Sequence, residues 1–474
     1  MRYPRRMAGA VLWAAAWIAA CGGPELLPAR HVLLLTVDTL RADHLSRNGY
    51  DRPTTPSLDA LLSQGVYFAR ASTPIPQTTQ ALASLLTGVY PHGHRVRDLT
   101  DRLPDDVAYL PELARTAGYR TIAVVSNHIL TPARGLGRGF EVYDAADDAR
   151  DAPQTTRDAL RAVAGLRGEE RIFLWVHYID PHVPYLPPPE LARRFDPEYS
   201  GPYGVGFGQG RGGVGDRAYP ADLPKRVAVF ANPLPKRVNE HIRRLYAADV
   251  RFTDDAIAEL VDELEARFGA DWLVVFAADH GESLGEHDYF YDHGDYLYEP
   301  SLRVPLAFVL PREHPLRRPA ELSALVSLVD VAPTLAELMG LDLASAWPEG
   351  RSLVPLLAGR SQEARPGFAE AGQSFFPDEL KRRVRFDVAG RPRAVLDGRW
   401  KLIWTPGQTP DLAFELYDLV ADPGETNDLH RPDHPELDRL RGLLFGWLRD
   451  TPSRSDEPSA DDLQRLRALG YVEP

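Results

Sequence analysis

The sequence predicts an α/β sandwich with a largely parallel central sheet and a smaller C-terminal α+β subdomain. From His31 onward, short apolar runs with high β propensity alternate with amphipathic segments, which is the pattern of strands joined by crossover helices. Several of these runs are apolar throughout, as expected for strands covered by helices on both faces. Beyond about Arg360 the apolar runs become sparse, which favours a separate subdomain with a short antiparallel sheet.

Each predicted element rests on one such segment. The predicted strands of the sandwich are Val32–Val37, Ile122–Ser126, Ile172–Val176, Trp272–Ala278 and Val304–Leu310. The helices predicted between them are Ser57–Gln64, Thr79–Leu86, Asp106–Ala117, Thr155–Leu166 and Asn239–Arg267. In the C-terminal subdomain, the predicted elements are strands Arg393–Leu396, Trp400–Thr405 and Phe414–Asp418 and helices Pro435–Arg449 and Ala460–Leu469.

The first 21 residues form a predicted export signal. Three arginines precede the apolar run Met7–Ala20, which is shorter than the ~20 residues that a membrane-spanning helix requires. Cys21 is the only cysteine of the chain and follows this run, where bacterial lipoproteins carry their acylated cysteine. We therefore expect an exported lipoprotein that is anchored to a membrane through Cys21 and faces the periplasm or the cell exterior.

The 474 residues also suggest how the rest of the chain is divided. A tether (22–30) is expected to lead into a catalytic domain (31–360), which contains a glycine- and tyrosine-rich insertion (196–236), and then into the C-terminal subdomain (361–474). The net charge is −13 and the basic residues are scattered. Nucleic acid is therefore not an expected partner, because binding a phosphate backbone requires a concentrated cationic face. A small anionic substrate stays open, because only a local site must attract it.

Polar residues follow four of the predicted strands, where ligands bind in sheets of this kind. Asp38 follows the first strand, Asn127 the second, the segment His177–His182 the third, and the pair Asp279-His280 the fourth. Since the carboxyl ends of parallel strands meet at one edge of a sheet, these side chains are expected to form one site.

A divalent metal is the predicted occupant of this site. Asp38, Asp279 and His280 supply two carboxylates and an imidazole, a donor set that suits a divalent cation exposed to substrate, calcium or zinc. Thr78 begins a predicted helix, where the macrodipole favours an anionic oxygen and a metal contact would produce a nucleophilic alkoxide. The competing interpretation is that Thr78 and Thr79 are ordinary N-caps.

Seven stretches, in order along nearly all of the mature chain, resemble the sulfatase family of the alkaline phosphatase superfamily. They are VDTLRADHLSRNGYDRPTTPSLDALLSQGVYFARA, SLLTGVYPH, WVHYIDPHVPY, AADHGESLGEH, LYEPSLRVPL, SLVDVAPTLAELMG and ELYDLVADPGETNDL. The resemblance implies a three-layer α/β/α sandwich, a C-terminal subdomain with a small antiparallel sheet, and hydrolysis of sulfate or phosphate esters. It also implies metal ligation by Asp38, Asp279 and His280.

The same resemblance implies roles for further residues. His182 matches a histidine that contacts substrate or leaving group, Asp180 lies beside it, and Asn127 falls in a stretch near the site. His287 follows the ligand pair closely and is a candidate substrate contact, or alternatively a surface residue. His293 stands near the position of a family lysine.

Three departures from the family pattern bear on the chemistry. Thr78 occupies the position of the cysteine that becomes formylglycine, Leu82 the position of the accompanying arginine, and Thr39 that of a second acidic ligand. A threonine nucleophile resembles the phosphate-handling relatives, in which histidines recruit a second metal. His293, His182 and Asp180 are the candidates for such a site, and a hydrogen bond from His293 to the substrate oxyanion is the equally favoured alternative.

The sequence thus predicts an exported, membrane-anchored, metal-dependent hydrolase of sulfate or phosphate esters, with Thr78 forming a covalent intermediate. The expected partner is a small anionic ester or the sulfated or phosphorylated group of a glycan or lipid. Two other functions stay open. One is a transferase that passes a phosphoethanolamine-type headgroup to a surface glycan, and the other is an inactive, glycan-binding relative of the sulfatases.

Overall fold

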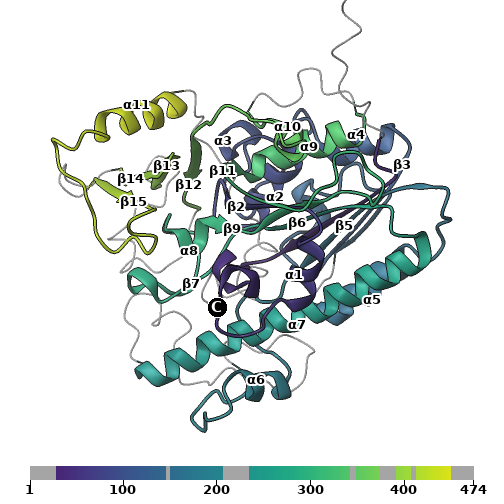
Figure 1. Ribbon diagram of the computed structural model, residues 1–474, viewed down its shortest axis with the longest axis horizontal. Helices are drawn as coiled ribbons and strands as arrows, with labels where there is room; N and C mark the ends of the chain where they lie inside the picture. Colours follow the sequence, from purple (N-terminus) through teal and green to yellow (C-terminus); the bar gives the residue numbers. More distant parts are fainter. Residues whose placement is uncertain are drawn as a thin grey trace, which may run out of the picture.

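The computed structural model describes residues 28–145, 150–206, 234–341, 349–372, 391–406 and 413–449. These residues form a three-layer α/β/α sandwich with a smaller C-terminal subdomain beside it, as predicted (Figure 1). The leader with Cys21, residues 207–233 of the insertion and the predicted helix Ala460–Leu469 lie outside the described residues. No helix in the described ranges is long and apolar enough to cross a membrane.

The central sheet has nine strands, eight of them in the order β11-β2-β10-β6-β1-β5-β3-β4, with β9 paired to β2. Its strands are β1 (His31–Val37), β2 (Val66–Ser72), β3 (Tyr119–Val125), β4 (Val142–Ala145), β5 (Arg171–Tyr178), β6 (Trp272–Ala278), β9 (Arg303–Val304), β10 (Leu306–Val309) and β11 (Ala320–Ser327). All pairs are parallel except those of β9 and β10, which run antiparallel to their neighbours.

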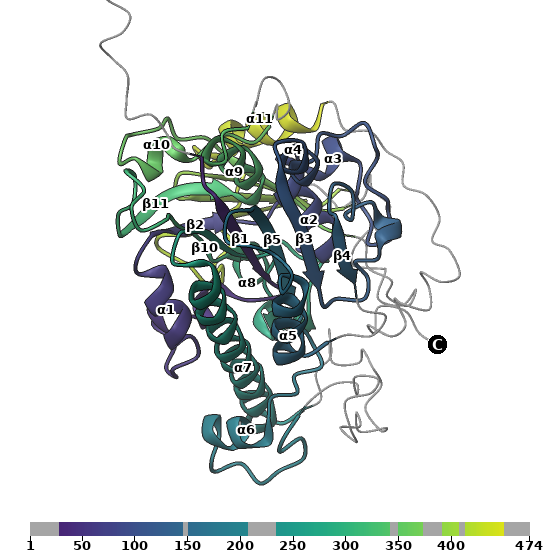
Figure 2. The ribbon, with the colours of Figure 1, turned by 90° about the vertical axis from the view of Figure 1, so that its right-hand side faces the viewer.

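Helices cover both faces of this sheet (Figure 2). One layer contains α1, α5 and α7, and the other contains α2, α4 and α9. The helices are α1 (Pro56–Leu62), α2 (Thr78–Thr87), α3 (Pro91–His94), α4 (Leu110–Thr116), α5 (Ala152–Ala162), α6 (Pro189–Phe195), α7 (Lys236–Phe268), α8 (Glu299–Leu302), α9 (Val331–Leu338), α10 (Val354–Leu357) and α11 (Leu437–Leu448). The 3₁₀ turns are Ala42–His44, Ser46–Asn48, Pro132–Arg134, Glu286–Asp288 and Leu328–Asp330.

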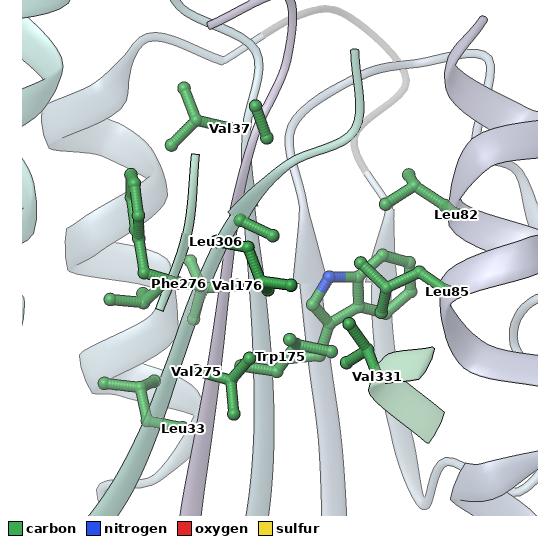
Figure 3. Packing of buried hydrophobic residues seen from close by; sticks show 14 of the residues in the cluster. Leu33, Val37, Leu82, Leu85, Trp175, Val176, Val275, Phe276, Leu306 and Val331 are labelled. Atoms are coloured by element: carbon green, nitrogen blue, oxygen red, sulfur yellow. The ribbon is translucent and has the colours of Figure 1, made fainter. Parts of the chain in front are cut away.

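The centre of the sheet is also the centre of the core. Every residue of β1 and β6 is buried, because each strand has a neighbour on both sides and a helix layer on both faces. Figure 3 shows Leu82 and Leu85 of α2 near Trp175 and Val331, with Phe276 on the far side of the sheet. Burial of each large apolar side chain contributes about 1.5–3 kcal/mol to folding. This packing fixes the strand ends from which the polar residues project.

The C-terminal subdomain is an antiparallel sheet covered by one helix. The sheet has the order β12-β13-β14-β15, with strands β12 (Gly367–Glu370), β13 (Arg393–Asp397), β14 (Trp400–Trp404) and β15 (Phe414–Asp418). Apolar side chains of this sheet pack against Leu437, Leu440 and Leu444 of α11. The boundary predicted near residue 360 falls between α10 and β12. A two-stranded sheet, β7 (Ser283–Leu284) and β8 (Phe290–Asp292), lies near the strand ends of the sandwich.

Some of the differences between the structure and the predicted elements have a clear physical cause. The predicted strand Val304–Leu310 is two short strands, β9 and β10, because Pro305 has no N–H with which to continue a ladder. Strands β2 and β11 were not predicted, since both carry partly exposed residues and lack a continuous apolar run. The predicted helix at Asp106 begins at Leu110, with Pro111 in its first turn, where proline is tolerated.

Candidate active site

The polar residues that follow β1, β3, β5 and β6 meet at one edge of the central sheet, as predicted. The register places Val37 of β1 opposite Tyr178 of β5 and Ala278 of β6. Asp38 and Asp279, the residues that follow β1 and β6, are therefore neighbours. The backbone N–H of Thr39 donates to Asp279 Oδ1 at 3.2 Å. Strand order thus brings together residues far apart in the chain.

Each of the three predicted metal ligands has one donor atom held by the protein and one left over. Asp279 Oδ1 accepts from the backbone N–H groups of Thr39 and His280, the latter at 2.7 Å. Asp38 Oδ2 accepts from Asn127 Nδ2 at 2.7 Å. Asp279 Oδ2 and Asp38 Oδ1 are buried and have no hydrogen-bond partner within the described part of the chain. His280 Nδ1 lies 2.9 Å from the Gly281 carbonyl and must donate to it, which leaves the lone pair on Nε2.

The three remaining atoms converge. His280 Nε2 lies 3.6 Å from Asp38 Oδ1 and 3.7 Å from Asp279 Oδ2. The ligand atoms of Asp38, Asp279 and His280 all lie within 4.8 Å of one another, and all three side chains are fully buried. Two carboxylate oxygens without hydrogen-bond partners in the described residues, together with an imidazole nitrogen, fit a divalent cation, which would satisfy groups that are otherwise costly to bury.

The electrostatics of the three groups fit the same occupant. Burial raises the pKa of Asp279 well above its ordinary value, and the nearby Asp38 carboxylate raises it further. Burial also tends to raise the pKa of Asp38, but the neighbouring imidazoles, His182 first, outweigh it and hold that pKa below its ordinary value. Burial lowers the pKa of His280, so its imidazole is neutral, the form that binds metals.

Thr78 lies directly beside this centre. It is the first residue of α2, and its Oγ1 lies 3.3 Å from His280 Nε2. The N-cap of α2 is Gln77, so the alternative in which Thr78 or Thr79 is the N-cap is wrong. Leu82, at the family's arginine position, is buried in the core against the sheet (Figure 3). The threonine hydroxyl therefore has the position expected of a nucleophile, with no arginine one turn further along the helix.

A buried chain of hydrogen bonds runs from Trp175 through Thr36 to His177, whose ring faces Asp38. Trp175 Nε1–H donates to Thr36 Oγ1 at 2.9 Å, and Thr36 Oγ1 lies 2.9 Å from His177 Nδ1. His177 Nε2 then faces Asp38 Oδ2 at 3.6 Å. His177 is fully buried. Position next to a strand end could have pointed to this role, but only the fold shows which neighbour it faces.

Two further histidines border the centre. The His293 ring lies 4.2 Å from the His280 ring and 5.2 Å from the His182 ring, between centroids. His182 Nδ1 lies 2.6 Å from the Val183 carbonyl. His293 Nδ1 lies 3.1 Å from Glu282 Oε1. Both histidines were predicted to act at the site, and both lie beside the predicted metal ligands.

Glu282 is a site residue that the sequence analysis did not single out. It is fully buried, and Tyr185 donates its hydroxyl to Glu282 Oε2 at 3.1 Å. Burial raises the pKa of Glu282 to about 8. The only signal in the sequence was its place two residues after His280, and a glutamate in such a turn is ordinarily solvated.

The predicted second metal site stays a prediction. In the described ranges, the one group of acids and histidines with ligand atoms within 4.8 Å of one another is Asp38, Asp279 and His280. Asp180 is buried after the end of β5 and His182 lies near His293, but the ligand atoms of these three residues do not form such a group.

His287 packs against an aromatic side chain. Its ring stacks on Tyr298 at 3.6 Å between centroids, and the Tyr298 hydroxyl donates to Glu415 at 2.7 Å. Glu415 belongs to β15 of the C-terminal subdomain. The backbone of His287 has a φ of 54°, in the left-handed region, so the chain turns sharply there. The substrate contact predicted at His287 stays a prediction. The same holds for the candidate roles of Asn127 and Asp180 in binding substrate.

Comparison with known proteins gives the family. The sequence model of the family described as "Sulfatase" matches residues 30–341, about two thirds of the chain. A second model, "N-sulphoglucosamine sulphohydrolase, C-terminal", matches residues 285–442.

Individual relatives match over most of their length. The choline-sulfatase of Rhizobium meliloti is 26% identical, covering 88% of this chain and 86% of its own. The delta 4,5-hexuronate-2-O-sulfatase of Bacteroides thetaiotaomicron is 25% identical, covering 96% of both chains. Among solved structures, the phosphonate monoester hydrolase of Agrobacterium radiobacter has a TM-score of 0.68 at 20% identity, covering 89% of this chain and 95% of its own, which supports the fold.

Proposed function

The chain belongs to the sulfatase family of the alkaline phosphatase superfamily and is a sulfatase-like hydrolase, and from that premise we propose that Thr78 is its nucleophile. The observation that carries the proposal is the 3.3 Å distance from Thr78 Oγ1 to His280 Nε2, at the point where the three ligand atoms converge. A divalent cation held by Asp38, Asp279 and His280 would supply positive charge that stabilises an anionic oxygen and lowers the pKa of a nearby hydroxyl. Calcium and zinc are the candidate cations.

With Thr78 as nucleophile, the reaction proceeds in two displacements at the sulfur or phosphorus. In the first, Thr78 Oγ1 passes its proton to a neighbouring imidazole and bonds to the sulfur or phosphorus, and the bond to the leaving oxygen breaks. His182 or His293, which both border the centre, takes up this proton and gives it to the leaving oxygen. In the second, water attacks the same sulfur or phosphorus and gives its proton to that imidazole, the bond to Thr78 Oγ1 breaks, and the proton returns to Thr78. Asn127 and His177 hold Asp38 in place through both steps.

The substrate proposed is a small anionic ester or the sulfated or phosphorylated group of a larger glycan or lipid. Two curated relatives are named for choline sulfate and hexuronate sulfate ester hydrolysis, and a structural neighbour for phosphonate monoesters. A threonine cannot form the hydrated aldehyde of formylglycine. The proposal therefore favours phosphate or phosphonate esters on mechanism, while sulfate esters are favoured by the family resemblance.

One assay separates these possibilities. Purified residues 22–474 are measured for bound metal and then tested on 4-nitrophenyl sulfate, 4-nitrophenyl phosphate, bis-4-nitrophenyl phosphate and a phosphonate monoester. Thr78→Ala should abolish turnover of the accepted ester, and Thr79→Ala, at the adjacent buried threonine, should leave it within a few-fold. Turnover that survives in Thr78→Ala overturns the nucleophile. Lack of both metal and turnover in the wild type favours the glycan-binding alternative.

We also propose that the protein is exported and lipid-anchored through Cys21. This proposal rests on the arginine-rich start, the short apolar run and the position of the single cysteine. Expression of the full chain with a clickable fatty acid should label the wild type and leave Cys21→Ser unlabelled. Equal labelling of both, or labelling of neither, would contradict the anchor.

A further inference from the structure

The two histidines beside the centre are held in different ways. His182 Nδ1 faces a backbone carbonyl, that of Val183, so no side-chain substitution removes its partner. His293 Nδ1 faces a side chain, the carboxyl of Glu282. The orientation of His293 can therefore be changed without changing His182.

Glu282 is itself fixed on several sides. Its Oε1 faces His293 Nδ1 at 3.1 Å and its Oε2 accepts from the Tyr185 hydroxyl at 3.1 Å. Its backbone carbonyl accepts from Arg41 Nη1 at 3.1 Å. Glu282 and Tyr185 are fully buried, and His293 is 2% exposed. A carboxyl group is costly to bury, and here each of its oxygens has a defined partner.

From this geometry we propose that Glu282 is a positioning residue that holds His293 with its proton on Nδ1 and its Nε2 turned away from the carboxyl, toward the reacting groups. The two nitrogens lie on opposite sides of the ring, so a contact at Nδ1 fixes the direction of Nε2. The same contact leaves the lone pair of the neutral ring on Nε2, where it can take up a proton and pass it to the leaving oxygen. The part of His293 in proton transfer rests on the proposed function. The orientation of its ring by Glu282 does not depend on that function.

A set of four variants tests whether Glu282 acts through His293. Glu282→Gln keeps an oxygen that accepts from His293 Nδ1–H, Glu282→Ala removes it, and His293→Ala and the Glu282→Ala/His293→Ala double variant complete a cycle. The rate is measured on whichever 4-nitrophenyl ester the wild type hydrolyses. Glu282→Ala should lower kcat about 10- to 100-fold with KM changed less than threefold, the size typical of lost outer-shell partners. Glu282→Gln should stay within about fivefold of the wild type.

The cycle separates positioning from a general structural effect. If Glu282 acts through His293, the double variant is no slower than His293→Ala alone. Losses that multiply in the double variant would overturn the proposal, as would a Glu282→Gln variant that is as slow as Glu282→Ala. Zinc affinity, measured by calorimetry on each variant, should stay within threefold, because none of the substitutions removes a residue of the Asp38–Asp279–His280 group.

A measurement without turnover tests the orientation directly. In protein labelled with ¹⁵N-histidine, long-range ¹H–¹⁵N correlation spectra distinguish the two tautomers, and His293→Ala identifies the signals. The wild type and Glu282→Gln should show His293 with its proton on Nδ1, and Glu282→Ala should show a mixture of tautomers. An Nε2–H tautomer in the wild type would overturn the proposal. If the wild type hydrolyses no ester, the proposed function fails, and these spectra still decide the role of Glu282.

Discussion

Replacing Asp38 with asparagine should stabilise the metal-free protein and remove its response to added metal. The ligand oxygens of Asp38 and Asp279 lie within 4.8 Å of each other in a fully buried site. At that separation and an effective dielectric constant of about 20, two negative charges repel by about 3 kcal/mol. Asparagine keeps an oxygen that accepts from Asn127 Nδ2, so that hydrogen bond is retained.

The size of this gain should depend on pH. Burial, and then Asp38, raise the pKa of Asp279 well above its ordinary value. An acid with a raised pKa in the folded state lowers stability progressively as pH rises above its unfolded pKa, because the unfolded chain ionises more readily. Removing the Asp38 charge lessens this penalty. The stability difference between Asp38→Asn and the wild type should therefore grow with pH, up to about 3 kcal/mol when Asp279 is ionised.

Urea denaturation measures both effects. Curves in EDTA at pH 6 and pH 8 should show Asp38→Asn more stable than the wild type, more so at pH 8. With zinc at a thousand times its dissociation constant, the wild type should gain about 4 kcal/mol and the variant far less. Asp271→Asn, an exposed position at the other end of β6, is the matched control and should behave as the wild type. A metal-free Asp38→Asn that is less stable than the wild type, or an unchanged response to zinc, would refute the reasoning.

Three further predictions concern the support of the site and the core. Asn127→Ala should weaken zinc binding about 10- to 100-fold in calorimetry, since it removes the donor to Asp38 Oδ2, and unchanged affinity would contradict this role. Thr78→Ala should keep full zinc affinity while its turnover falls at least about 10³-fold, so loss of both would point to a misplaced ligand set instead. Burial lowers the pKa of His94 to about 3, so the folded protein resists a proton that the unfolded chain takes up below about pH 6.5, and stability should fall by about 2–3 kcal/mol between pH 7 and pH 4.5. His94→Asn, which retains an acceptor for the Val96 N–H, should lack that fall in urea denaturation, and an identical pH profile would contradict it.

The sequence was sufficient for the parts of the site that follow from strand order. Strands β1 and β6 carry long apolar runs, so their burial under helices on both faces and the polar residues at their ends could be predicted. The structure adds that β1 and β6 are paired neighbours, so the residues after them lie side by side. Strand β2 could not be predicted, because Ala69 and Arg70 are only partly buried and the run reads as neither a covered strand nor a helix.

Contacts that depend on the direction of a side chain could not be predicted from the sequence. The pairing of Glu282 with His293 spans the β7–β8 hairpin, and no periodicity links the two residues. A second metal on Asp180, His182 and His293 stays a prediction, since their ligand atoms do not lie within 4.8 Å of one another in the described residues. His287 was a candidate substrate contact because of its place in the chain, and only the fold shows that its ring stacks on Tyr298.

We propose that Thr78, beside a metal held by Asp38, Asp279 and His280, forms a covalent ester with the substrate. This intermediate can be trapped by quenching the metal-loaded protein with acid during turnover of the accepted ester and mapping its peptides by mass spectrometry. We expect one sulfuryl or phosphoryl group on the peptide that contains Thr78, located on Thr78 by fragmentation and missing in Thr78→Ala. A group on another residue, or on Thr79 in both proteins, would contradict it.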